Sequence, residues 1–297
     1  MRRIPHLTSI LQRIFVATAV LAVFLLPVFT PDARASEPRW YVGLSVPVMF
    51  LDNSDSVTSG TSLGAPYSAD ATNEFSAGFK VSGMVGREFG NGFRLQVEGF
   101  FARAEVSELS YTGVTTDIPG AGPISLQGTE IPVSGPADQM GAMVNVWYDF
   151  NEGSRWRPFI GGGLGFVVVD WGGVDYEQGA LEASVYNQTV GLLRAQCAMI
   201  PDPVQQAGCN ARVPTGPFPR QAVPDLSDTD TVFAYKVGGG LGYELTNHIT
   251  LQVSYRFFKT NQLEFKGRNS LGNFVNTVSA TTDLQGHLFE VGARYRF

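Results

Sequence analysis

The stretch "LFEVGARYRF", residues 288–297, alternates apolar and polar side chains without interruption. Successive side chains of a β-strand point to opposite faces, so such a strand has two different faces. One face carries Phe289, Val291, Ala293, Tyr295 and Phe297; the other carries Leu288, Glu290, Gly292, Arg294 and Arg296. The pattern predicts a strand between an apolar medium and a polar one, which fits a membrane barrel and also a soluble sandwich.

The N-terminal residues have the order of an export signal. Arginines at 2, 3 and 13 precede an apolar run, and Ala33-Arg34-Ala35 supplies a small-residue cleavage site. We therefore expect residues 1–35 to be a cleaved signal peptide and residues 36–297 to form one barrel domain. The alternative is a retained anchor, for which a run of about 16 residues is short. No later apolar run reaches membrane-spanning length, which leaves a periplasmic protein, a secreted protein or an outer-membrane barrel.

The composition favours the barrel. The chain has 34 Gly, 21 Phe and 10 Tyr, and only 16% of its residues are charged. Strands with one face in lipid and one towards a wet interior have such a composition. The net charge of −6 and the lack of a basic patch argue against nucleic acid as a partner.

The spacing of the alternating segments predicts the topology. Long polar stretches at 52–74, 107–137, 172–230 and 266–286 alternate with tight turns, as in barrels with long extracellular loops and short periplasmic turns. We predict an all-β fold: an eight-stranded antiparallel up-and-down transmembrane β-barrel whose last strand pairs with its first, so that no edge faces lipid. The predicted strands are 39–51, 75–89, 93–106, 138–150, 157–171, 231–245, 249–265 and 288–297.

Two short motifs carry a family resemblance. Phe297 ends the chain with Tyr295 two residues before it, and "RPFIGGGLGF" at 157–166 is a glycine-rich strand. Both motifs resemble those of small outer-membrane β-barrels and porin-like proteins of Gram-negative bacteria, including surface antigens and OmpA-like barrel domains. The resemblance implies an outer-membrane location. It also implies that Tyr295 and Phe297 form the signal that the outer-membrane assembly machinery reads.

Charged residues fall on the strand faces opposite the lipid. Eight strands enclose an interior that side chains just fill, so we expect paired charges to plug the lumen; an ion path is the alternative. Glycines at 161–163 and 238–240 are expected to relieve crowding or let the sheet bend. The predicted charge network comprises Lys80, Glu88, Arg94, Glu98, Lys236, Glu244, Arg256, Glu290, Arg294 and Arg296, with Gln96, Asn145, Asp149 and Gln252 on the same faces.

Aromatic residues near the strand ends are typical of interfacial girdles. The expected periplasmic girdle contains Trp40, Phe89, Phe93, Tyr148, Phe150, Tyr243, Tyr295 and Phe297, and the outer girdle contains Phe50, Phe75 and Trp171.

The longest outer stretch, 172–230, contains the only two cysteines, Cys197 and Cys209. In an exported protein this pair predicts a disulfide. A metal site is the rival interpretation, but with three histidines in the chain a thiol–imidazole site lacks ligands. The surrounding segment 199–225 is rich in proline, and we expect neither a regular strand nor a regular helix there.

A lipid-modifying enzyme is a minor alternative. His287 at the outer end of the last strand, with Ser279 or Ser270 and Asp283, is the candidate catalytic set. No nucleophile motif supports the set, so we predict no enzymatic activity. We also expect no cofactor, because a strand and not a helix follows "GGGLG".

Two functions therefore remain. The first is a structural scaffold that presents extracellular loops to a host or cell-surface ligand. The alternative is a porin-like channel for small solutes. The expected partners are outer-membrane lipids and the barrel assembly machinery, and not nucleic acid.

Overall fold

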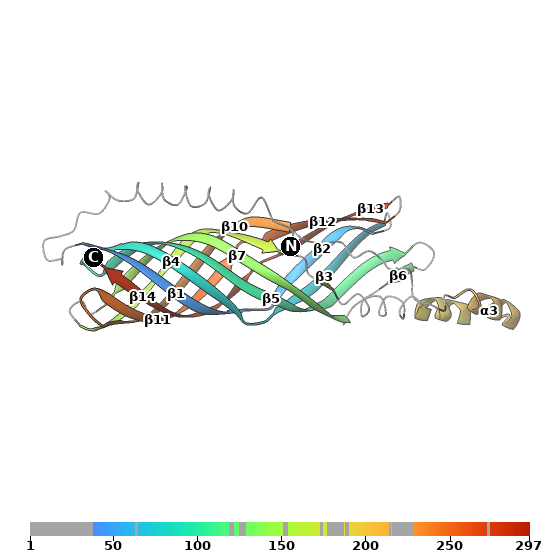
Figure 1. Cartoon of the computed structure of the whole chain (residues 1–297). Helices are drawn as coiled ribbons and strands as arrows, with labels where there is room; N and C mark the ends of the chain where they lie inside the picture. Colours follow the sequence, from blue (N-terminus) through green and yellow to red (C-terminus); the bar gives the residue numbers. More distant parts are fainter. Residues whose placement is uncertain are drawn as a thin grey trace.

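The structure, a computed structural model, describes residues 38–62, 65–118, 122–124, 129–150, 154–172, 175–176, 187, 190–213, 215, 228–271 and 274–297. The expected signal peptide, 1–35, lies outside these residues. The described strands form one elongated antiparallel sheet that curls around a common interior (Figure 1). No helix in the described part of the chain combines the length and apolar character needed to span a membrane.

Eight strands close into a ring, as predicted. Each pairs antiparallel with two neighbours, and the last strand pairs with the first from Tyr41–Arg296 to Leu51–Gly286. Every lipid-facing edge is thereby removed. In ring order the strands are β1 (Arg39–Leu51), β4 (Gly78–Glu88), β5 (Phe93–Ile118), β7 (Thr129–Asp149), β8 (Trp156–Trp171), β10 (Asp228–Glu244), β11 (Ile249–Thr260) and β14 (Gln285–Arg296).

Three short connections between ring strands, at 89–92, 150–155 and 245–248, lie at the same end of the ring as the start of β1; we call it the turn end. Gly92 shows why glycine is needed there. Its φ of 86° lies in the left-handed region, and a Cβ would stand 2.7 Å from the Tyr148 ring. The opposite end is the hairpin end.

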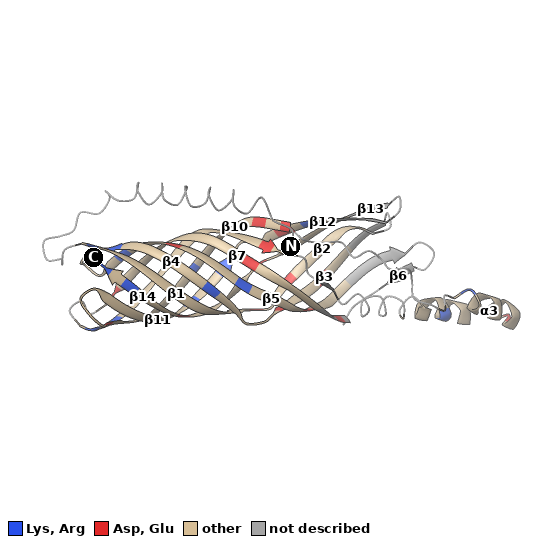
Figure 2. Cartoon of the chain, in the orientation of Figure 1, with Lys and Arg blue, Asp and Glu red and all other residues tan. Residues whose placement is uncertain are grey.

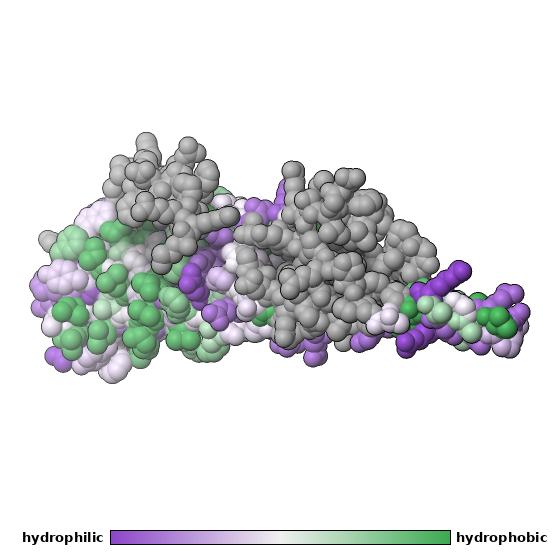
Figure 3. All heavy atoms as spheres, turned by 45° about the vertical axis from the view of Figure 1, so that its right-hand side comes forward, coloured by the Kyte–Doolittle hydropathy of each residue, from purple (hydrophilic) through white to green (hydrophobic). Residues whose placement is uncertain are grey.

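The outer face of the ring carries an apolar belt. On β1 the exposed residues alternate from Trp40 to Phe50, a span that matches the roughly 9–11 residues of a transmembrane strand. Figure 3 shows hydrophobic residues gathered over the part of the barrel near the turn end. Towards the hairpin end the belt stops at outward charges such as Arg103 and Lys259. The alternation in 288–297 therefore has the predicted orientation, with its aromatic face outward.

Most of the expected outer loops are strands. The stretch 52–74 folds into β2 (Ser54–Ser62) and most of β3 (Ala65–Phe75), and β5 and β7 extend far beyond the belt. Two short strands, β6 (Gly122–Ile124) and β9 (Asp175–Tyr176), pair with these extensions. The Ser- and Thr-rich composition hid these strands because neither of their faces meets lipid.

The predicted strand 249–265 is two strands. It breaks at 261–262 into β11 and β12 (Leu263–Leu271), and β12 forms a hairpin with β13 (Phe274–Thr282). Side-chain carboxylates join β12 to β10: Asp230 accepts from the Glu264 N–H (2.8 Å) and Asp228 from the Lys266 N–H (2.9 Å). Figure 2 shows acidic residues on β10, which bonds β12 through two of them.

The segment 172–230 contains helical structure, so the expectation for its proline-rich part was wrong. Residues 190–198 are helical, and α3 (Pro203–Asn210) follows. Pro203 starts α3, where a missing N–H costs nothing, and Asp202 caps the helix. The predicted disulfide between Cys197 and Cys209 joins the two helices into what we call the helical hairpin, which lies beyond the hairpin end (Figure 1).

The outer girdle was predicted only in part. Phe50 faces outward, but Trp171 is 7% exposed and points into the interior, where it packs against Phe265. Phe75, also predicted for the outer girdle, packs against Trp171 and the interior core as well. Register explains the error: outward Asp170 alternates with Trp171. Towards the turn end, Trp40, Phe93, Tyr148, Phe150, Tyr295 and Phe297 are exposed as expected.

Candidate functional site: a charged plug in the barrel lumen

The interior changes character along the barrel axis. From the middle towards the hairpin end it is filled by apolar side chains, among them Phe100, Met143, Val167, Phe258 and Leu288. Nearer the turn end the inward positions are charged. Two groups of charges, which together we call the plug, occupy this part of the lumen.

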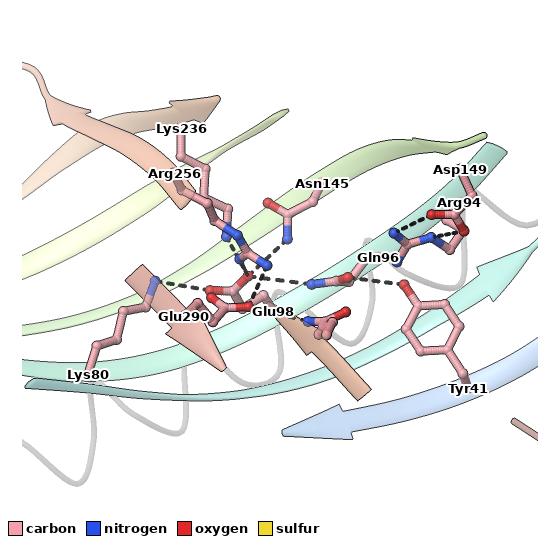
Figure 4. A network of polar contacts seen from close by, with 11 residues as sticks. Tyr41, Lys80, Arg94, Gln96, Glu98, Asn145, Asp149, Lys236, Arg256 and Glu290 are labelled. Carbon is pink, nitrogen blue, oxygen red and sulfur yellow. Dashed lines mark hydrogen bonds and ion pairs between the residues drawn. The ribbon is translucent and has the colours of Figure 1, made fainter. Parts of the chain in front are cut away.

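The central cluster comprises Lys80, Glu98, Lys236, Arg256 and Glu290 (Figure 4). The Glu98 carboxylate lies at its centre and is 0% exposed. It accepts from Lys80 (3.0 Å), from Lys236 and from Arg256 (3.4 Å). Arg256 also donates to Glu290 (2.5 Å), so one guanidinium connects both carboxylates.

Neutral amides complete the shell around Glu98. Asn145 donates to its carboxylate over 3.1 Å and Gln96 over 3.4 Å. Gln96 in turn accepts from the Tyr41 hydroxyl (3.0 Å). This chain of hydrogen bonds runs from the central cluster towards the turn end (Figure 4).

The mouth cluster lies at the turn end and comprises Glu88, Arg94, Asp149, Arg157, Glu244, Arg294 and Arg296. Arg94 donates to Asp149 (2.8 Å), and Arg294 donates to Glu88 (3.1 Å). Glu244 accepts from Arg157 (2.7 Å) and from Arg296. Six of the eight ring strands contribute to this cluster, so its pairs hold the ring together across the lumen.

Four buried cations also lie over aromatic faces, which attract cations through their quadrupoles. The Lys80 ammonium is 3.9 Å from the centre of the Phe100 ring. The guanidinium carbons of the arginines lie 4.8–5.5 Å from their rings: Arg256 over Trp147, Arg94 over Phe159 and Arg294 over Tyr41. These aromatic partners were not anticipated from the sequence, although they share the inward faces of their strands.

Glycine makes room for the plug. A Cβ at Gly163 would stand 1.9 Å from Asn145 Oδ1, the amide that bonds Glu98. At Gly238 it would stand 2.3 Å from the backbone oxygen of Tyr255. The glycine-rich strands therefore let neighbouring strands and the plug approach closely.

The structure places all ten residues of the predicted network in the lumen and brings them together in the two clusters. Eight of them are buried; Glu88 and Glu244, at the mouth, are half-buried. Asp149 was placed correctly on the inward face. Arg157 was missed, because it precedes a proline at the start of its strand and the alternation there is weak.

The candidate catalytic residues whose side chains are described are not brought together. His287 contacts the Tyr255 hydroxyl through Nδ1 (2.7 Å) and Asp52 through Nε2 (3.4 Å). Ser279 instead donates to Glu264, and Asp283 pairs with Lys259. The side chain of Ser270 lies outside the described residues. Within the described part of the chain, no group of three or more His, Cys, Asp and Glu residues is arranged to hold a metal ion.

Comparisons with known proteins agree with this architecture. The family model "Outer membrane protein beta-barrel domain" matches residues 16–297. A protein of Gluconacetobacter diazotrophicus named "Outer membrane protein" is 24% identical over 232 residues, which cover 74% of this chain but 47% of that protein. The chain thus spans about half the length of that relative.

Among solved structures, the chain is similar to the outer membrane protein OprG of Pseudomonas aeruginosa, with 14% identity and a TM-score of 0.44; the match covers 89% of this chain and 97% of OprG. It is also similar to the outer membrane protease OmpT of Escherichia coli, with 8% identity and a TM-score of 0.40; the match covers 91% of this chain and 100% of OmpT. The family match spans the whole described barrel and carries the assignment. The chain belongs to the outer membrane protein β-barrel domain family and is a protein of the bacterial outer membrane.

Proposed function

We propose that the protein is a plugged outer-membrane scaffold that presents its hairpin end outside the cell. One observation carries the proposal: the Glu98 carboxylate, fully buried in the middle of the lumen, contacts cations from three other strands. Lys80, Lys236 and Arg256 thereby bridge the lumen at one level. Together with the apolar filling towards the hairpin end, this bridging supports a barrel that does not conduct ions at rest.

Single-channel recording in a planar bilayer tests the proposal. We expect the folded wild-type protein to be silent. Arg256→Ala should produce openings, because it removes the guanidinium that connects Glu98 with Glu290 and leaves space for water. Arg103→Ala is the matched control, since Arg103 lies on the outer face and pairs with Asp138 there. Steady openings of the wild type would contradict the proposal and favour the porin-like channel.

The parts offered to a ligand are the extended hairpins and the helical hairpin. The disulfide and a small apolar core of Val190, Cys197 and Val213 support the helical hairpin as a unit that keeps its shape away from the barrel. Replacing residues 190–213 by a short Gly-Ser connection should leave barrel folding intact and abolish attachment to a host or neighbouring cell. Unchanged attachment would assign the ligand to the β-hairpins.

The terminal aromatics are proposed to be read by the assembly machinery. Tyr295 and Phe297 are 50% and 65% exposed on the outer face of the strand that closes the ring, where they also contact lipid. Phe297→Ser should lower the amount of folded barrel in cells without affecting refolding of the purified chain in detergent. Equal losses in both assays would indicate a role in stability alone.

We also propose that the protein is not an enzyme. Both ring nitrogens of His287 are engaged by Tyr255 and Asp52, and Ser279, the candidate serine whose side chain is described, donates to Glu264. His287→Ala should leave the lipid A profile of the cell unchanged, and an altered profile would overturn this conclusion.

A further inference from the structure

The plug contains a surplus of positive charge. The central cluster sets three cations, Lys80, Lys236 and Arg256, against the carboxylates of Glu98 and Glu290. The mouth cluster sets four arginines against three carboxylates. Uncompensated charge in a closed interior is costly, and aromatic faces offset only part of it. By formal charge the described side chains of the plug are therefore positive, although the whole chain carries −6.

Hydrogen-bond donors are in surplus as well. The Nε–H groups of Arg256, Arg294 and Arg296 and the indole N–H of Trp147 have no hydrogen-bond partner among the described residues. All four side chains are at least nine-tenths buried. The unpartnered atoms of the plug that can only accept are fewer, namely one oxygen of Glu290 and the amide oxygen of Asn145; the unpartnered serine hydroxyls can donate as well as accept. A buried donor without an acceptor costs about 1–3 kcal/mol. The lumen therefore favours a ligand that accepts hydrogen bonds and donates none.

The side chains that carry two of these donors, Arg256 and Trp147, are in contact. The Arg256 guanidinium lies 4.8 Å from the centre of the Trp147 ring. Trp147 packs edge-on against Phe159, with ring centroids 5.6 Å apart. Arg94 of the mouth cluster lies over the face of the Phe159 ring. Arg256 therefore lies over the Trp147 ring, which is 1% exposed, and Arg94 lies one ring further away, over Phe159.

We propose that the lumen binds a small inorganic anion, such as chloride, beside Arg256 and Trp147. The proposal rests on the plugged lumen proposed above. An anion there balances the surplus of the central cluster and accepts from the unpartnered N–H groups. A cation is repelled by the same side chains, and water satisfies the donors without balancing the charge.

The test compares chloride with gluconate, an anion too large for the closed lumen, at equal ionic strength. The sample is the folded protein extracted from membranes into detergent, and the thermal unfolding midpoint is measured. A ligand that binds only the folded state stabilises it by mass action, so the midpoint should rise with chloride concentration. Bromide, which quenches indole fluorescence, should quench the emission of Trp147.

Two variants locate the site. Arg256→Gln, which removes the charge surplus of the central cluster, should abolish the chloride effect. If that variant does not fold, Trp147→Phe keeps an aromatic ring beneath the guanidinium and removes only the N–H; the apparent Kd for chloride should then rise about tenfold or more. Arg103→Gln and Trp156→Phe are matched controls on the outer face and should behave as wild type.

Equal midpoints in chloride and gluconate would overturn the proposal and mean that water alone satisfies the donors. A chloride effect of the same size in Arg256→Gln and Arg103→Gln would overturn it too, as a general salt effect. The conductance recording separates this proposal from the preceding one. A silent barrel without a chloride effect refutes only the anion site, whereas steady wild-type conductance refutes the plug.

Discussion

Replacing Glu98 by glutamine removes the one negative charge that three buried cations share. The change keeps the shape of the side chain, but the central cluster is left with Lys80, Lys236 and Arg256 against Glu290 alone. Removing one partner of a buried ion pair typically costs about 3–5 kcal/mol, because the remaining charge stays desolvated. We expect Glu98→Gln to lower the free energy of unfolding by about this amount.

Urea unfolding of the barrel refolded into lipid vesicles, followed by tryptophan fluorescence, measures this loss. The control is Asp138→Asn, which breaks the pair with Arg103 on the outer face, where the two side chains are 26% and 47% exposed. Such exposed pairs contribute about 0–1 kcal/mol. Adding Lys236→Met to Glu98→Gln removes one of the unbalanced cations and should recover a large part of the stability.

A loss for Glu98→Gln no larger than that for Asp138→Asn would refute the reasoning. It would mean that water reaches the central cluster and screens its charges, and the plug would no longer follow from burial. A double variant that is less stable than Glu98→Gln would show that Lys236 contributes through packing and not through charge.

Three further outcomes can be checked by the same unfolding assay or by proteolysis. Gly163→Ala should cost about 1–3 kcal/mol, because its Cβ would stand 1.9 Å from an asparagine oxygen, whereas Gly99→Ala, with nothing within 4 Å, should be nearly neutral. Leu44→Arg, in the middle of the apolar belt, should lower the free energy of unfolding by about 2–4 kcal/mol, and Phe50→Arg, at the edge of the belt, by about 0–1 kcal/mol. Equal costs would mean that the belt is not centred near Leu44. Cys197→Ser should speed proteolysis of the helical hairpin while urea unfolding of the ring stays unchanged, since the disulfide lies outside the barrel.

The ring could be predicted because each of its strands has one face towards lipid. Because lipid lies on one side and a polar interior on the other, apolar and polar residues alternate strongly along each strand, as in 288–297. This alternation places the ten network residues on the inward face by position alone. The pairing of those residues could not be predicted. Glu98 and Arg256 are 158 positions apart, and only the register around the closed ring brings them together.

The predictions from the sequence failed in the part of the protein beyond the apolar belt, where the strands do not face lipid. Beyond the belt both strand faces are polar or weakly apolar, so β2, β3 and β13 resemble loops. Trp171 was assigned to the outer surface because aromatics cluster at membrane boundaries, yet the interior at that level is also apolar. Proline content concealed α3, because Pro203 occupies the one helical position that tolerates it.

The seam between β10 and β12 affects how the outer part of this protein can evolve. A backbone ladder fixes the register of two strands, so an insertion in either one shifts all pairs beyond it. At this seam two aspartate side chains, Asp228 and Asp230, bond the edge of β12 in place of such a ladder. Beyond the ladder that β13 forms with β2, the β12–β13 hairpin can therefore change in length without changing the pairing of β10 in the ring. The outer hairpins can thus diverge in sequence while the eight-stranded ring keeps its pairing.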